Sequence, residues 1–149
     1  MTFGELIEGL GKSLGVEMTD EGGAAAVEVD GIPVVLQRAS DDLLLVHADL
    51  GEVAPDSRER VLAAAMEANF LYQGTGGATL AVDSRDGHLH LQKYNWLDRI
   101  DMDKVLSGLT RFADTVKAWK GIAASSAADT PPDASPASPP PPSTDFLPV

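Results

Sequence analysis

Two histidines separated by one residue, His88 and His90, form the pair in this 149-residue sequence that is best suited to binding a metal ion. On a β-strand, residues two apart point to the same side of the sheet, so both imidazoles would face the same way. Zinc sites normally use at least three protein ligands, and no cysteine or acidic residue is forced by its spacing to join this pair. We therefore predict that Leu89 and Leu91 face the core, that the histidines face solvent, and that the chain holds no metal and no cofactor.

Other candidate catalytic motifs are incomplete. Gly74, Gly76 and Gly77 superficially resemble a phosphate-binding loop, but such a loop opens a helix, whereas a helical pattern precedes these glycines and a strand pattern follows them. Asp101 and Asp103 lack the remaining ligands of a calcium loop and suit the start of a helix better. No nucleophile elbow occurs either. The sequence predicts no catalytic residue and a protein that is not an enzyme.

The composition restricts the partners of the protein. The chain carries 23 acidic and 11 basic side chains, with a formal net charge of −12 and a pI near 4.4. Binding to nucleic acid or to an anionic membrane requires clustered lysine and arginine, so we expect neither partner. There is no cysteine, no apolar run of about 20 residues and no positively charged leader. These features predict a small, acidic, soluble intracellular protein.

The sequence divides into a folded domain and a tail. Eight of the ten prolines lie between positions 131 and 148, and the last 26 residues are mostly alanine, serine and proline. Such a segment buries too little apolar surface to offset the entropy of ordering it. We expect a domain over residues 1–123 and a disordered tail over residues 124–149. The end of the tail, 146–149, is apolar enough to be a docking peptide, although an inert solubilising tail is the simpler interpretation.

The positions of apolar residues predict the elements of the domain. Apolar residues between 3 and 14 recur at helical spacing, and Thr2 with Glu5 has the spacing of a capping box. Alternating patterns predict strands at 27–29, 32–38 and 43–50, and Pro55 opens a second helix that runs to about Phe70. A hairpin of strands at 78–82 and 88–94 follows, and Asp101 caps a long third helix. The order is α-β-β-β-α-β-β-α, which predicts an α+β sandwich with a twisted antiparallel sheet.

The second and third strands carry more apolar surface than one core needs. An antiparallel sheet with one solvated face would alternate more cleanly between apolar and polar residues. We expect Val35, Leu43 and Leu45 to be the uncovered set, because His47 and Asp49 continue their side of the third strand. We expect either a helix or another molecule to cover the second face of these strands. Apolar surface beyond the needs of the core indicates a protein that binds other proteins.

The sequence resembles the class I type III secretion chaperones, the CesT-like or Tir chaperone family, over about residues 3–122. The resemblance depends on the order of the elements and on local sequence at 62–69, 76–83 and 89–91, and on a final apolar helix. It implies a homodimer in the bacterial cytoplasm, built on a five-stranded sheet with three helices. The proline-rich tail departs from the family pattern.

The resemblance also implies roles for particular residues. The second helix and the strand of the later hairpin would make the dimer interface, with the candidate residues Leu62, Met66, Asn69, Phe70 and Leu80. An effector segment in extended conformation would bind near the first helix and the early strands, with the candidate residues Leu6, Leu10, Val35, Leu43 and Leu45. The protein would keep the N-terminal segment of an effector unfolded and soluble for export. The alternative function is a regulatory adaptor of the same fold that binds a protein other than secreted cargo.

Overall fold

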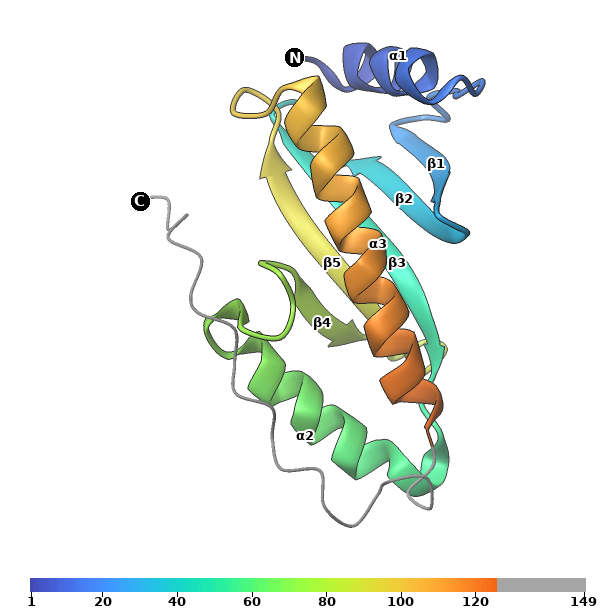
Figure 1. Cartoon of the computed structure of the whole chain (residues 1–149), viewed down its shortest axis with the longest axis vertical. Helices are drawn as coiled ribbons and strands as arrows, with labels where there is room; N and C mark the ends of the chain where they lie inside the picture. The colour runs from blue at the N-terminus through green and yellow to red at the C-terminus, as the bar shows by residue number, and fades with distance from the viewer. Residues whose placement is uncertain (126–149) are drawn as a thin grey trace.

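The computed structural model of the chain describes residues 1–125 (Figure 1), and the predicted tail beyond Ser125 lies outside the described residues. The predicted order of helices and strands is confirmed. The elements are α1 (Phe3–Leu14), β1 (Ala24–Val29), β2 (Ile32–Arg38), β3 (Leu43–Glu52), the 3-10 turn η1 (Pro55–Ser57), α2 (Arg58–Asn69), the 3-10 turn η2 (Phe70–Tyr72), β4 (Thr79–Val82), β5 (His88–Trp96) and α3 (Met102–Ala124).

Helix α1 begins and ends where its sequence predicts. The Thr2 hydroxyl accepts the backbone N–H of Glu5 at 3.2 Å, and the Glu5 carboxylate accepts the backbone N–H of Thr2 at 2.7 Å. This capping box satisfies donors that the first helical turn leaves free. Gly15 ends the helix with a φ of 67°, a left-handed conformation that glycine adopts without a steric penalty. The buried side of the helix consists of Phe3, Leu6, Ile7 and Leu10.

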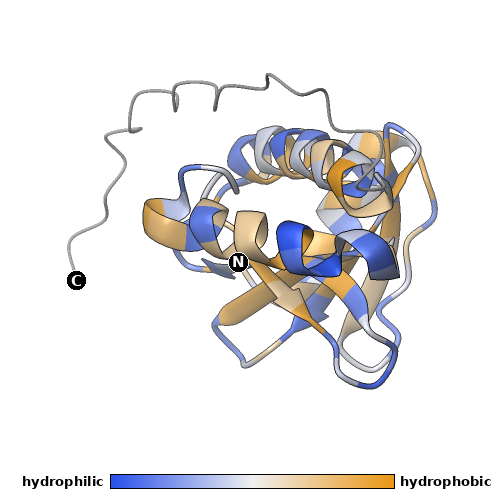
Figure 2. Ribbon diagram, turned by 90° about the horizontal axis from the view of Figure 1, so that it is seen from below, coloured by the Kyte–Doolittle hydropathy of each residue, from blue (hydrophilic) through white to orange (hydrophobic). Residues whose placement is uncertain are grey.

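The five strands form one antiparallel sheet in the order β1-β2-β3-β5-β4. Helix α3 crosses one face of this sheet, which we call the inner face (Figure 1), and the helices lie on the same side in the view of Figure 2. Alternate residues of the strands point to the inner face and build the core, because a strand reverses its side chains at each step. The inner-face residues include Val27, Val34, Leu36, Leu44, Val46, Ala48, Leu80, Leu89 and Leu91.

Helix α3 supplies the other half of the core. Its N-terminus is capped by the Asp101 carboxylate, which accepts the backbone N–H of Lys104 at 2.9 Å. Near its other end, the indole of Trp119 donates to the carbonyl of Gly74 at 3.0 Å. The helix buries Val105, Leu109, Phe112, Ala113, Val116, Trp119 and Ala123. No helix within residues 1–125 is long and apolar enough to cross a membrane.

Helix α2 packs against the core through small side chains. Val61 and Ala65 are its buried residues, and Gly74 approaches so closely that a Cβ added there would lie 2.6 Å from the Cβ of Ala68. Ser125 holds the start of the helix, because the Ser57 hydroxyl and the Arg60 guanidinium both donate to its carbonyl, at 2.9 and 3.1 Å. These bonds attach the start of α2 to the residue that follows the end of α3.

Candidate functional site

The outer face of the sheet carries an apolar surface that crosses three adjacent strands. Register places Leu45 opposite Tyr94 and Leu43 opposite Trp96, while Val35 lies diagonally beside Leu45. Cross-strand neighbours on one face have Cβ atoms about 5 Å apart, so these side chains form a continuous surface. We call the five residues Val35, Leu43, Leu45, Tyr94 and Trp96 the outer strip.

The described chain leaves the outer strip open. Tyr94 is 55% exposed and Trp96 is 49% exposed, while the three aliphatic residues are half-buried by one another. Arg99 lies over the Trp96 ring, with its guanidinium carbon 5.9 Å from the ring centroid. Large aromatic side chains are rarely left in water without a reason when they adjoin other apolar groups. The strip is therefore a candidate surface for binding a partner.

Two of the predicted partner-binding residues lie elsewhere. The side chains of Leu6 and Leu10 are 0% exposed, because the apolar side of α1 packs onto the core. In this conformation they present no surface to a partner, and contact with one would require α1 to move. Val35, Leu43 and Leu45 do share the uncovered face, so the structure brings together only three of the five predicted residues.

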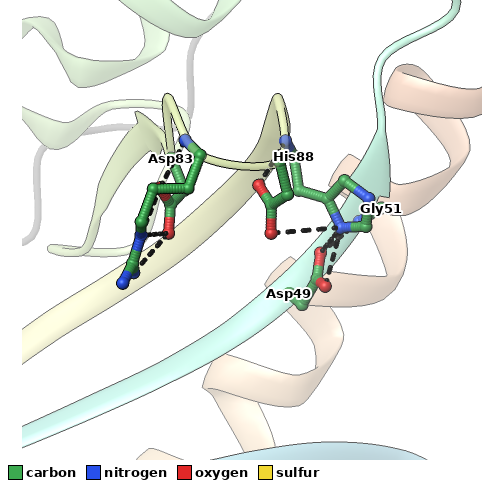
Figure 3. Close-up of polar contacts among 6 residues, drawn as sticks. Asp49, Gly51, Asp83 and His88 are labelled. Carbon is green, nitrogen blue, oxygen red and sulfur yellow. Dashed lines mark hydrogen bonds and ion pairs between the residues drawn. The ribbon is translucent and has the colours of Figure 1, made fainter.

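A polar region continues the outer face beyond the strip. The His88 imidazole donates from Nδ1 to the Asp49 carboxylate, at 2.9 and 3.0 Å from its two oxygens (Figure 3). This hydrogen bond raises the pKa of His88 because it favours the charged imidazolium. Burial lowers the pKa of His47, and a charge on the nearby His90 would lower it further. The pKa values of two histidines on one face are therefore shifted in opposite directions.

The turn between β4 and β5 borders this polar region. Arg85 donates to both oxygens of the Asp83 carboxylate, at 3.0 Å from Oδ1 and 2.6 Å from Oδ2. These charge-assisted bonds hold the pKa of Asp83 well below its usual range. A shallow open hollow lies on the outer face between this turn and the strip, and it is lined in part by Leu45, His47, Asp83, Arg85 and His90. The hollow joins the apolar and the polar parts of the face.

A second exposed apolar surface lies on α2 and the turn after it. Leu62, Met66 and Phe70 follow one another at intervals of four residues and therefore share one side of the helix. Met66 is 72% exposed, Phe70 is 68% exposed, and Leu71 and Tyr72 extend the surface with 58% and 52%. We call these five residues the α2 stripe. Ala65, the neighbour of Met66 in the sequence, faces the core beside Val61.

The end of the α2 stripe is held in a strained backbone conformation. Leu71 has a φ of 53° and Tyr72 a φ of 55°, in the left-handed region that costs a residue with a side chain about 1–2 kcal/mol. Turn hydrogen bonds stabilise the conformation, from Gln73 N–H to the Phe70 carbonyl and from Thr75 N–H to the Tyr72 carbonyl. Strain of this kind persists where the surrounding structure enforces it, and it is common at functional surfaces.

Two predicted interface residues have roles inside the chain. The amide of Asn69 donates to the Leu80 carbonyl at 3.0 Å and accepts the Leu80 backbone N–H at 2.8 Å. Asn69 thus attaches the end of α2 to the edge strand β4. The Leu80 side chain is 5% exposed and pairs with Leu91 on the inner face, so it offers no side-chain surface to a second copy.

Sequence patterns missed the two aromatic residues of the outer strip. The predicted last strand ends at Tyr94, whereas β5 continues to Trp96. Because residues two apart on a strand share a face, an extension of that strand by two residues would have placed Trp96 beside Tyr94. The alternation of His88, His90 and Tyr94 with Leu89 and Leu91 is the signal that could have found this surface.

Comparisons with known proteins agree on one fold. Residues 5–120 match the model of the Tir chaperone protein (CesT) family. The HopA1–SchA chaperone–effector complex contains a chain with a TM-score of 0.65 and 15% identity, and the match covers 80% of this chain and 93% of that one. The type III secretion chaperone SycH of Yersinia pestis, in complex with a stable fragment of YscM2, has a TM-score of 0.64 and 22% identity. That match covers 79% of this chain and 99% of the other.

A third solved structure shares the architecture. The ExsC–ExsE complex contains a chain with a TM-score of 0.63 and 17% identity, and the match covers 81% of this chain and 94% of that one. No curated protein matches the sequence. Identities this low establish the fold, while the partners named in these structures belong to those proteins.

Proposed function

The chain belongs to the Tir chaperone protein (CesT) family, and we propose that it is a type III secretion chaperone that binds the N-terminal segment of an effector in extended conformation. The family and the fold point to a role without catalysis. Binding would keep the segment unfolded and soluble until export. The site of action in this proposal is the bacterial cytoplasm, where an effector waits before secretion.

The observation that carries this proposal is the open outer strip. Its five apolar residues lie on β2, β3 and β5, so a bound segment would cross the strands over a flat surface rather than enter a pocket. Transfer of apolar effector side chains from water onto this surface is favourable in proportion to the area covered. The same contact masks a stretch of effector that would otherwise aggregate. The mechanism is stoichiometric and needs no hydrolysis of ATP.

We further propose that two copies of the chain associate through the α2 stripe. Three residues at intervals of four form a self-complementary ridge, which suits a two-fold interface in which the same patch meets itself. Met66 and Phe70 are the most exposed large apolar side chains within residues 1–125. A patch of this kind on a separate subunit marks a protein interface. A homodimer would present two outer strips to one effector segment.

Capture of the partner tests the proposed function. The full chain would be isolated from the producing bacterium under conditions that induce secretion, and co-purified proteins identified by mass spectrometry. We expect one effector, protected from limited proteolysis over a segment near its N-terminus. The double variant Leu43→Asp and Leu45→Asp should reduce co-purification at least about tenfold, because it places charge where apolar side chains would lose water.

A matched control separates loss of the surface from loss of the fold. The double variant Ser107→Asp and Thr110→Asp adds the same charge at exposed positions on α3 and should retain the partner. Circular dichroism should show both variants folded. A partner that remains bound to the Leu43 and Leu45 variant would contradict the proposed surface. Recovery of a protein that is not secreted would support the regulatory adaptor instead.

A further inference from the structure

The hairpin between β4 and β5 gathers two carboxylates and one imidazole on the outer face. One donor atom from each of Asp83, Asp86 and His90 lies within 4.8 Å of the other two. Asp83 follows the last residue of β4, Asp86 lies in the turn, and His90 lies in β5. The hairpin reverses the chain over a few residues, so the three side chains meet without the help of any distant segment. The spacing of the histidines alone did not indicate that these two carboxylates lie beside His90.

His90 has a ring nitrogen that lacks a partner. Its Nε2 atom is shielded from solvent and forms no hydrogen bond with any group in residues 1–125. A shielded polar atom without a partner costs on the order of 1–3 kcal/mol. In the histidine tautomer that carries its proton on Nδ1, Nε2 offers a lone pair to a ligand. A shielded, unsatisfied nitrogen on the imidazole of this trio is a second and independent sign of a missing group.

The other two histidines of the chain lie beside this trio. The His88 and His90 ring centroids are 6.5 Å apart, and His88 Nδ1 is 4.0 Å from an oxygen of Asp86. His47 also lies near His90 on this face, where both line the open hollow. All three histidines of the sequence are thus concentrated at one end of one face.

We propose that Asp83, Asp86 and His90 form a binding site for a divalent transition-metal ion, with zinc as the best-suited ion and water completing the coordination. Two carboxylate oxygens and one imidazole nitrogen are a ligand set that zinc accepts. Calcium and magnesium prefer sites made of oxygen alone, so the imidazole selects against them. The site goes beyond the proposed chaperone function, because the outer strip could bind a partner without it.

Arg85 gives the site a built-in competitor. Its guanidinium donates to both oxygens of Asp83, at distances between 2.6 and 3.1 Å. A metal ion on Asp83 must share this carboxylate or displace the arginine. Arg85 is almost fully exposed, so it can move into solvent when the ion binds. Removal of the arginine should therefore strengthen metal binding, a result that unrelated surface binding would not produce.

Calorimetric titration tests the site directly. The full chain without an affinity tag would be stripped with a chelator and titrated with zinc chloride, calcium chloride and magnesium chloride in turn. We expect one zinc ion per chain and no calcium or magnesium binding at the same concentrations. Asp86→Asn and His90→Gln should each weaken zinc binding at least about tenfold. Arg85→Gln should strengthen it by about two- to fivefold, because an exposed ion pair is worth little.

Control variants make the outcome decisive. Asp98→Asn and His47→Gln remove the same kinds of group outside the trio and should change zinc affinity less than about threefold. Thermal denaturation with chelator present should show each variant folded. The proposal is overturned if zinc does not bind, if Asp86→Asn and His90→Gln leave the affinity unchanged, or if Arg85→Gln weakens it. Loss of binding in His88→Gln with retention in His90→Gln would also overturn it, since the ion would then belong to His88 and Asp49.

Discussion

The outer strip and the α2 stripe are both apolar and both open, yet they differ in how the chain supports them. Outer-strip residues are paired across strands, and the three aliphatic ones are half-buried by their neighbours. In the α2 stripe, Met66 and Phe70 are more than two-thirds exposed and the backbone beside them is strained. A surface that partly covers itself can remain without a partner between binding events. A surface as exposed as the α2 stripe suits a permanently bound partner. We therefore assign the effector to the outer strip and a second copy of the chain to the α2 stripe.

The two surfaces also depend on different parts of the fold. The outer strip is positioned by the hydrogen-bonded ladder of the sheet, whereas the α2 stripe is positioned by two polar anchors. Asn69 attaches the end of α2 to β4, and Ser125 attaches its start to the end of α3. Damage to an anchor should therefore affect the α2 stripe and leave the strip in place.

The largest expected effect is on the α2 stripe itself. Met66→Glu places a charge near the two-fold axis of the proposed dimer, opposite the same charge from the second copy. We expect the dimer dissociation constant to rise at least about 100-fold, which corresponds to about 3 kcal/mol. Sedimentation equilibrium measures it, with Ala118→Glu as the control at an exposed position on α3. A well-folded wild-type monomer at micromolar concentration would remove the basis for this assignment.

Loss of the Asn69 anchor should have the next largest effect. Asn69→Ala leaves the backbone N–H and carbonyl of Leu80 without partners, at a cost of about 2 kcal/mol for two hydrogen bonds. For a domain of this size we expect the melting temperature to fall by about 8 °C. Glu67→Ala, an exposed change on the same helix, should lower it by less than about 2 °C. Equal melting temperatures for the two variants would show that Asn69 is not an anchor.

A smaller effect is expected at the aromatic end of the outer strip. Trp96→Ala removes an indole that is 49% exposed and lies outside the core, so stability should change little. Partner binding should weaken about tenfold, which corresponds to about 1.4 kcal/mol. Affinity for the captured effector segment and the melting temperature would be measured together. A large fall in melting temperature would mean that Trp96 supports the fold rather than the partner.

The smallest expected effect is a difference in melting temperature between two truncated chains. Removal of residues 126–149 should leave the melting temperature within about 2 °C of the full chain, as we expect for the proline-rich tail. Removal of residues 124–149 also deletes Ser125, which accepts hydrogen bonds from Ser57 and Arg60. That truncation should lower the melting temperature by about a further 4 °C, equivalent to about 1 kcal/mol. Identical values for both truncations would show that the Ser125 contacts contribute nothing.

Much of the fold could be predicted because its signals are local. The capping box of Thr2 and Glu5 and the Asp101 cap are both present as expected. In β3, only His47 and Asp49 indicated that Leu43 and Leu45 lie on the side away from the core, where the structure places them. Each of these signals spans only a few neighbouring residues, so the helical and strand periods can be recognised from the sequence alone.

The candidate sites could be predicted only in part. Val35, Leu43 and Leu45 were found from the pattern of their own strands, but Tyr94 and Trp96 were not, because β5 comes about 50 residues later in the chain. Leu6, Leu10 and Leu80 have the residue types of a binding surface, yet packing places them in the core. An apolar residue fits either role, and only its neighbours in space distinguish the two.

The sequence by itself determined the elements, their order and the alternation of faces, since these depend on caps, turns and periods within single segments. Tertiary structure alone decided that β3 lies between β2 and β5, that Asn69 holds Leu80, and that Asp83 and Asp86 meet His90. The physical reason is that strand pairing and side-chain convergence are selected by the packing of the whole core. That packing sums contacts between distant segments, and no single segment of the sequence records it.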